Sequence, residues 1–270
     1  MRLLMLVSAA ICTSVVLGAD VKEPGELPAY ELPKDPKAAV LTLDFTGGFG
    51  PPRQNDEPTL VIRADGTAIV GNPWGQQKRM EVKLEKAQVQ ALLWFALEKN
   101  KFFDLDAAKL KGEVMEAQQK KGGLGFAIAD AATTTIRIHA NGKEHEVQYY
   151  ALGMAANQWP QVKGLASLHA IEKKLNQVRS EIYPGGPAGV AERLKLANAE
   201  LKAKHPDAAP LTANDLQTAW QLANGQTTVA FMRQSEADGK ITTINAQVAE
   251  AEKGPAKVTV NVNVRETPQK

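Results

Sequence analysis

Four acidic residues beside the first predicted strands are the strongest candidates for chemistry in this sequence: Asp44, Asp56, Glu57 and Asp65. Paired carboxylates can act as general acid and general base without a fixed spacing in the sequence, so two of them facing each other in a cleft would suit a hydrolase. The chain contains 30 acidic residues, however, and acidic neighbours therefore arise by chance. We expect that the protein is not an enzyme, with a carboxylate-based hydrolase acting on envelope material as the alternative.

The sequence lacks the other common motifs for catalysis and cofactor binding. A phosphate-binding loop leads into a helix, whereas Gly47-Gly48-Phe49-Gly50 is followed by two prolines and is typical of a turn. Neither the G-x-S-x-G of serine hydrolases nor the H-E-x-x-H of zinc proteases occurs. Of the four histidines, His139 and His145 fall on opposite faces of a predicted hairpin and cannot share a zinc ion. We therefore predict no cofactor and no metal site.

Trp74 is the one residue that we single out for partner binding. It lies in the polar turn Asn72-Pro73-Trp74-Gly75, where nothing requires its burial. An exposed tryptophan is a typical anchor in contacts with a protein or a sugar, so the partner would be a protein or a glycan. The alternative is that Trp74 folds back as a lid over the edge of the sheet.

The first nineteen residues predict export. Arg2 precedes the apolar run Leu3 to Leu17 and the small pair Gly18-Ala19, which is the pattern of a signal peptide (1–19). A retained anchor and a lipoprotein modified at Cys12 are alternatives, although the run is shorter than the roughly 20 residues of a membrane span. Cys12 is the only cysteine, so the mature chain would have no disulfide. We expect a secreted or periplasmic protein with no membrane span after cleavage.

Charge and composition narrow the range of partners. The 32 basic and 30 acidic residues give a net charge of +2, so the chain lacks the basic excess that nucleic acid binding requires. Hydrophobic residues make up 44% of the sequence, which is ordinary for a globular protein. We therefore expect no nucleic acid partner and a packed core.

Turn and breaker residues divide the mature chain into three parts. Residues 20–37 carry four prolines among charged residues and predict an extended tether. Residues 38–183 form the first predicted domain, which ends at the breaker Pro184-Gly185-Gly186-Pro187. Residues 188–266 form a smaller C-terminal unit. The breaker predicts a hinge, so the stretch Val40–Ile182 is expected to fold alone.

The spacing of hydrophobic residues predicts an α+β fold both for residues 38–183 and for residues 188–266. In the first, an antiparallel sheet of hairpins is covered by two helices, 85–99 and 161–182, with a weaker polar helix at 107–121. The best turn signal, Asn141-Gly142, pairs His139 with Glu144 and Ile138 with His145. The second part reads as a helix-helix-three-strand unit, with helices 188–204 and 213–223 and strands 227–234, 240–249 and 257–265.

Val40–Ile182 also resembles a family of exported bacterial α+β domains of unknown function. The resemblance rests on turn and core residues, namely Phe49-Gly50-x-Pro52, Ile62-x-x-Asp65-Gly66-Thr67, Gly71, Phe102-Phe103, Val147-x-Tyr149-Tyr150 and Pro160. It covers a little over half of the chain, and the cysteine associated with the Phe-Gly element in such domains is absent here. The resemblance implies an exported α+β domain and no particular activity. We expect a cofactor-free binding or structural module of the periplasm or cell exterior.

Overall fold

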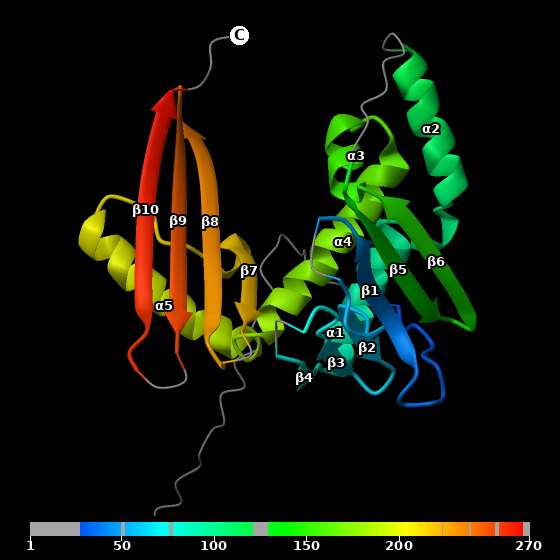
Figure 1. The fold of residues 1–270 in the computed structure, drawn as a ribbon, viewed down its shortest axis with the longest axis horizontal. Helices are drawn as coiled ribbons and strands as arrows, with labels where there is room; N and C mark the ends of the chain where they lie inside the picture. The colour runs from blue at the N-terminus through cyan, green and yellow to red at the C-terminus, as the bar shows by residue number, and fades with distance from the viewer. Residues whose placement is uncertain are drawn as a thin grey trace, which may run out of the picture.

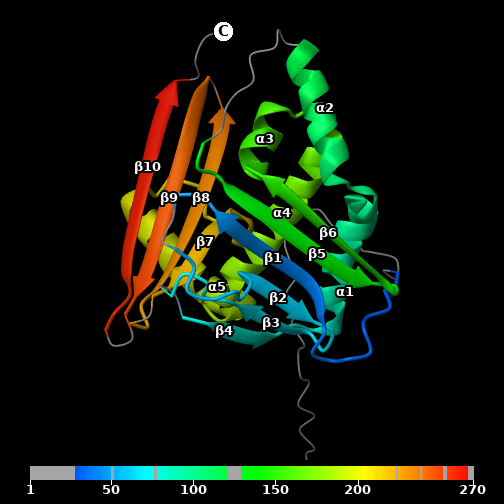
Figure 2. The same cartoon turned by 45° about the vertical axis from the view of Figure 1, so that its right-hand side comes forward.

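The computed structural model describes residues 28–49, 52–75, 78–120, 129–222, 224–237, 239–251 and 254–266. Within these residues the chain has the predicted α+β fold, with two antiparallel sheets and five α-helices (Figures 1 and 2). The predicted signal peptide and residues 20–27 of the predicted tether lie outside the described residues.

The first sheet has six strands in the order β4-β3-β2-β1-β5-β6. These are β1 (Ala39–Gly47), β2 (Leu60–Arg63), β3 (Thr67–Val70), β4 (Met80–Lys83), β5 (Ala132–Ala140) and β6 (Lys143–Tyr150). The register expected across Asn141-Gly142 is confirmed, because Ile138 pairs with His145 and His139 with Glu144. The turn needs backbone with positive φ, which Asn141 and Gly142 both adopt.

Four α-helices belong to the same unit as this sheet: two lie between β4 and β5 in the chain, and two come after β6. They are α1 (Lys86–Trp94), which continues as a π-helix over Phe95–Lys99, then α2 (Ala107–Lys120), α3 (Leu152–Gln158) and α4 (Lys163–Ile182). The apolar stripes expected on α1 and α4 are buried, as Leu93 and Leu165 show. Both helices therefore contribute a full face to the core, because an apolar stripe at helical spacing is stable only when another layer covers it.

The second sheet packs against one long helix. Its strands β7 (Leu216–Gln221), β8 (Thr227–Ala237), β9 (Lys240–Glu250) and β10 (Lys257–Glu266) lie in the order β10-β9-β8-β7, and α5 (Gly186–Lys204) packs on one face (Figure 1). Along β10, Val260 is buried under this layer, while Thr259 and Asn261 are exposed. The three strands expected here are confirmed, and the alternation of valine with polar residues reflects one covered face and one open face.

The second helix predicted for this unit, at 213–223, is wrong. Thr212 and Asp215 do form the expected capping box, but the helical turn ends at Asp215 and β7 begins at Leu216. β7 then pairs with β8 from Gln221 opposite Thr227 to Leu216 opposite Phe231. A short apolar run fits either structure locally, and here pairing with a neighbouring strand decides it.

Part of the predicted tether belongs to the folded domain. Tyr30 is buried, and its backbone N–H donates to Gln90 Oε1 at 2.7 Å while Gln90 Nε2 donates to the Tyr30 carbonyl at 3.1 Å. Glu31 makes a similar pair, since its N–H donates to Asn141 Oδ1 and its carbonyl accepts the Asn141 N–H, both at 2.8 Å. At residues 30 and 31 the tether prediction is therefore wrong, because these side-chain amides pair with the backbone N–H and carbonyl groups as a neighbouring strand would.

Helix α4 connects the two sheets. It packs against α3 in the first unit and against β7 and α5 in the second, and its C-terminal end reaches β7 in both views (Figures 1 and 2). The breaker at 184–187 covers the end of the turn between α4 and α5 and the first two residues of α5, and Tyr183 and Pro184 within or beside it are buried. Burial raises the pKa of Tyr183 to about 12. Whether the two units fold independently stays a prediction.

Candidate functional site

Asp44, the first of the candidate acids, is held by an arginine. Arg53 Nη1 donates to both Asp44 carboxylate oxygens, at 3.0 and 2.8 Å, and to the Phe45 carbonyl at 3.0 Å. Thr59 donates to the same carboxylate through its N–H and its hydroxyl, each at 3.1 Å. The side chains of Asp44 and Arg53 are only 17% and 21% exposed. Asp44 is thus a structural brace that ties β1 to the following loop, and its lone pairs are already engaged.

Two other candidate acids are also paired with cations. Glu57 Oε1 accepts from Arg79 Nε at 2.8 Å and Oε2 from the Asn72 N–H at 3.2 Å. Asp65 Oδ1 accepts the Thr67 N–H at 2.8 Å, and Lys83 Nζ lies 3.1 Å from its other oxygen. These contacts, the Thr67 amide first, lower the pKa of Asp65 to about 2. A general acid needs a raised pKa, so this carboxylate is unsuited to the role.

Asp56 is exposed, so the four acids do not form one site. Asp44 and Glu57 are both linked to Arg53, Glu57 through its backbone carbonyl, which accepts from Arg53 Nη2 at 2.9 Å. Asp65 lies at the other end of β2, in the turn to β3. The arrangement stabilises a loop and does not present two carboxylates to a substrate.

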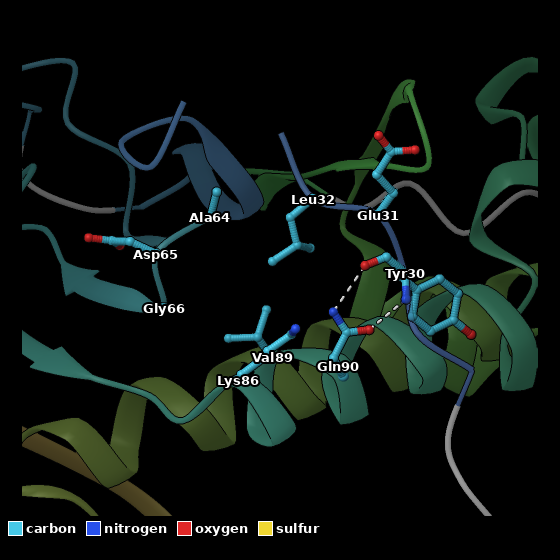
Figure 3. A pocket seen from close by; sticks show the side chains of 9 residues that line it. All are labelled: Tyr30, Glu31, Leu32, Ala64, Asp65, Gly66, Lys86, Val89 and Gln90. Atoms are coloured by element: carbon cyan, nitrogen blue, oxygen red, sulfur yellow. Dashed lines mark hydrogen bonds between the residues drawn. The ribbon is translucent and has the colours of Figure 1, made fainter. Parts of the chain in front are cut away.

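A cavity of about 500 Å³ lies between the N-terminal segment, the β2–β3 turn and α1. Its walls carry the charged residues Glu31, Asp65 and Lys86 and apolar side chains that include Leu32 and Val89 (Figure 3). The carboxylates of Glu31 and Asp65 point away from each other in this view. The cavity therefore lacks the facing pair of acids that a carboxylate-based hydrolase requires.

Two of the four histidines, His145 and His169, have structural partners. His145 Nε2 donates to the Leu105 carbonyl at 2.7 Å, and its ring packs edge-on against Phe102 with centroids 5.4 Å apart. His169 Nδ1 lies 2.9 Å from Glu172 Oε2, one turn along α4. Among the residues that the structure describes, no group of three His, Cys, Asp or Glu side chains is arranged to hold a metal ion.

Trp74 is neither fully exposed nor fully buried. Its turn is held by the loop that Arg53 anchors, because the Gln54 N–H donates to the Pro73 carbonyl at 2.6 Å and Asn55 Nδ2 to the Asn72 carbonyl at 3.2 Å. A half-buried side chain fits the anchor and the lid equally, so its role in partner binding stays a prediction.

Phe49, which the sequence reasoning did not select, is the most exposed large apolar side chain among the described residues, at 95%. It follows Gly47 and Gly48, whose backbones have φ of 72° and 84°. A Cβ at Gly48 would lie 3.0 Å from the backbone N of Ala132, so this close approach favours glycine. The available signal was that Phe49 is the only phenylalanine with glycine on both sides.

Two further exposed side chains belong to the same end of the first sheet. The Phe49 N–H donates to the Asp130 carbonyl at 3.1 Å, and the next residue, Ala131, donates its N–H to the Tyr150 hydroxyl at 3.0 Å. Tyr150 ends β6 and is 41% exposed, and Met154, in the first turn of α3, is 58% exposed. We call Phe49, Tyr150 and Met154 the Phe49 surface.

Comparison of the chain with protein-family models, with curated proteins and with solved structures finds no match in any of the three. The resemblance of Val40–Ile182 to exported bacterial domains therefore stays a prediction. Across the described residues, no helix has both the length and the apolar character needed to cross a membrane.

Proposed function

We propose that the protein is an exported, cofactor-free binding module of the periplasm or cell exterior, and that it contacts a protein partner through the Phe49 surface. The observation that carries this proposal is the 95% exposure of Phe49. Exposing an aromatic ring to water forgoes the favourable burial that a phenylalanine usually gains, so such a residue is typical of a contact site.

The composition of the Phe49 surface favours a protein partner over a glycan. Phenylalanine, tyrosine and methionine are enriched at the centres of protein interfaces. The backbone next to Phe49 is held in place, because Arg53 donates to Asp44 on β1 and to the Glu57 carbonyl in the loop that follows Phe49. A supported anchor loses less conformational freedom on binding, which favours affinity.

Export is the first part of the proposal to test. We expect the protein recovered from the periplasm or medium of the exporting cell to begin at Ala19 or Asp20, because Gly18-Ala19 fits the small-residue rule for signal cleavage. Intact-mass measurement decides this. A chain that retains residues 1–17 would contradict cleavage, and a chain found only in the cytoplasm would contradict export.

The partner test uses a photoreactive phenylalanine analogue at position 49. Irradiation of exporting cells should give a defined crosslinked protein with the analogue at Phe49. The same analogue at Met115, which is 60% exposed on α2, is the matched control and should not give it. Mass spectrometry of the product identifies the partner for affinity measurement. Equal labelling from both positions would contradict the proposal.

Once that partner is purified, Phe49→Ala should weaken its binding by about 2 kcal/mol, a roughly 30-fold rise in Kd, as loss of an interface anchor does. The unfolding midpoint should hardly change, because an exposed ring contributes little to the core. Trp74→Ala discriminates between the two candidate anchors. If Trp74→Ala weakens binding and Phe49→Ala does not, the sequence-based choice is correct and the Phe49 surface is not the site.

A further inference from the structure

In the part of the chain that the structure describes, the two sheets have four edges, and three of these are protected against pairing with another strand. β4 is only four residues long and includes the charged Glu81 and Lys83. β6 carries Lys143, Glu144 and Glu146 along its length and lies beside α2. β7 is covered by α4, and its Gln221 carbonyl accepts the Lys78 N–H at 3.1 Å. Short length, charge and cover are the usual means of blocking edge-to-edge association.

β10 lacks these protections along its middle, and its charged residues lie only at its two ends. It runs for ten residues and pairs with β9 along its whole length on one side, while the described residues place no strand on its other side. In both views β10 is the outermost element of its sheet (Figures 1 and 2). Between Val258 and Val264 the strand contains no proline and no charged residue. Its outer backbone amide and carbonyl groups are therefore available to a further strand.

Helix α5 packs on one face of β10 but leaves one valine of that face exposed to solvent. Val260 is buried by the helix layer, whereas Val264, four residues on and on the same face, is 60% exposed. Val262 between them is half-buried. Val260, Val262 and Val264 form a row on this face. A strand added beside β10 with a valine on the same face would shield Val264, the exposed end of that row.

We propose that β10 pairs antiparallel with β10 of a second copy of the chain, joining two four-stranded sheets into one of eight strands. A two-fold axis brings a strand against itself in antiparallel orientation, and each copy offers one such edge, so the assembly closes at two copies. The alternation of valine with threonine or asparagine keeps the apolar face continuous when the axis passes through a residue of the strand.

The charges at the ends of β10 exclude one register, and the exposed Val264 favours another. An axis through Asn261 would place Lys257 opposite Arg265 of the second copy, which is unfavourable for like charges directly opposed. An axis through Val262 places Thr259 opposite that arginine and pairs Val264 with Val260 of the second copy, and it leaves only Glu266, the last residue of the strand, opposite a valine, Val258. This register covers the most exposed valine of one strand with the most buried valine of the other, and we assign the pairing to it.

The dimer should dissociate on dilution. A single pair of strand edges buries mainly backbone and one row of side chains, which is less than the roughly 1,600 Å² of a standard stable interface. Sedimentation velocity over a dilution series of the mature wild-type chain should therefore show a monomer–dimer equilibrium. A wild-type chain that stays monomeric up to its solubility limit would overturn the proposal, including the case in which β10 accepts a strand from a different protein.

Val264→Lys is the decisive variant. Because Val264 is largely exposed in the single chain, lysine is tolerated there, but it places a charge against Val260 of the second copy and should raise the dimer Kd at least about tenfold. Gln247→Lys is the matched control, since Gln247 is exposed on the open face of β9, one strand from the edge, and should leave the Kd unchanged. Dimerisation that survives Val264→Lys, or that both variants weaken equally, would overturn the assignment to β10.

Amide hydrogen exchange on the wild-type chain keeps the test valid if Val264→Lys fails to fold. The outward-facing amides between Val258 and Val264 should exchange more slowly at high protein concentration than at low concentration, because pairing protects them. Amides of β4, the short charged edge, serve as the internal reference and should show no such dependence. Exchange along β10 that is independent of concentration in a dimerising chain would place the interface elsewhere.

Discussion

Replacing Asp44 by alanine should lower the free energy of unfolding by about 3 kcal/mol, because it leaves the largely buried Arg53 without its carboxylate partner. The Thr59 amide and hydroxyl lose their acceptor in the same change. Asp44→Asn should cost less, since an amide oxygen can still accept from Thr59. Urea denaturation of the two variants and the wild-type chain measures these differences.

Asp56→Ala is the control for this prediction. Asp56 lies in the same loop but is exposed, so its loss should change the free energy of unfolding by no more than about 0.5 kcal/mol. A small effect of Asp44→Ala would mean that the Arg53 contact is not a brace. The loop that follows Phe49 would then lack the support that we assign to it.

Ending the chain after Ile182 should destabilise the N-terminal unit by about 3 kcal/mol or more. The last turns of α4 carry the buried residues Val178 and Ile182, and this end of the helix reaches β7, which the truncation removes (Figure 1). Exposing a buried aliphatic side chain costs about 1.5–3 kcal/mol. Urea denaturation followed by circular dichroism compares a fragment of residues 28–182 with the chain of residues 28–266.

The control separates loss of contacts from loss of chain continuity. A protease site inserted between Gly185 and Gly186, in the turn before α5, allows the folded chain to be cut without removing either part. The cut protein should keep most of its stability, because the contacts of α4 with β7 and α5 persist. A 28–182 fragment as stable as the full chain would instead show that the breaker at 184–187 separates two independent domains, as the sequence predicts.

Local patterns in the sequence determined much of the secondary structure. Asn141-Gly142 predicts the register of the β5–β6 hairpin because a two-residue turn with positive φ allows one pairing of the strands that follow it. The alternation from Val258 to Val264 predicts a strand with one open face, and the apolar stripe of α4 predicts a helix that packs on another layer. Each of these signals lies within a few residues of the structure that it specifies.

Tertiary structure decided the features that depend on distant partners. Leu216–Gln221 is a strand because β8 lies beside it, although its short apolar pattern also suits a helix. Tyr30 is fixed by Gln90, 60 residues away, and Glu31 by Asn141, 110 residues away. Neither contact can be recognised from the local sequence, because an extended segment that packs on the domain and an unpacked tether have similar compositions.

In the candidate site too, the local sequence determined some features and tertiary contacts determined others. The sequence alone identified Asp44, Asp56, Glu57 and Asp65 as carboxylates near the ends of strands, but their partners became evident only in the fold. It also indicated that the Gly47–Gly50 stretch is a turn, without showing that Phe49 stands exposed while Trp74 is half-buried. Exposure depends on what the rest of the chain places against a side chain, so residue type and spacing determined the elements, and only packing decided which surface is open.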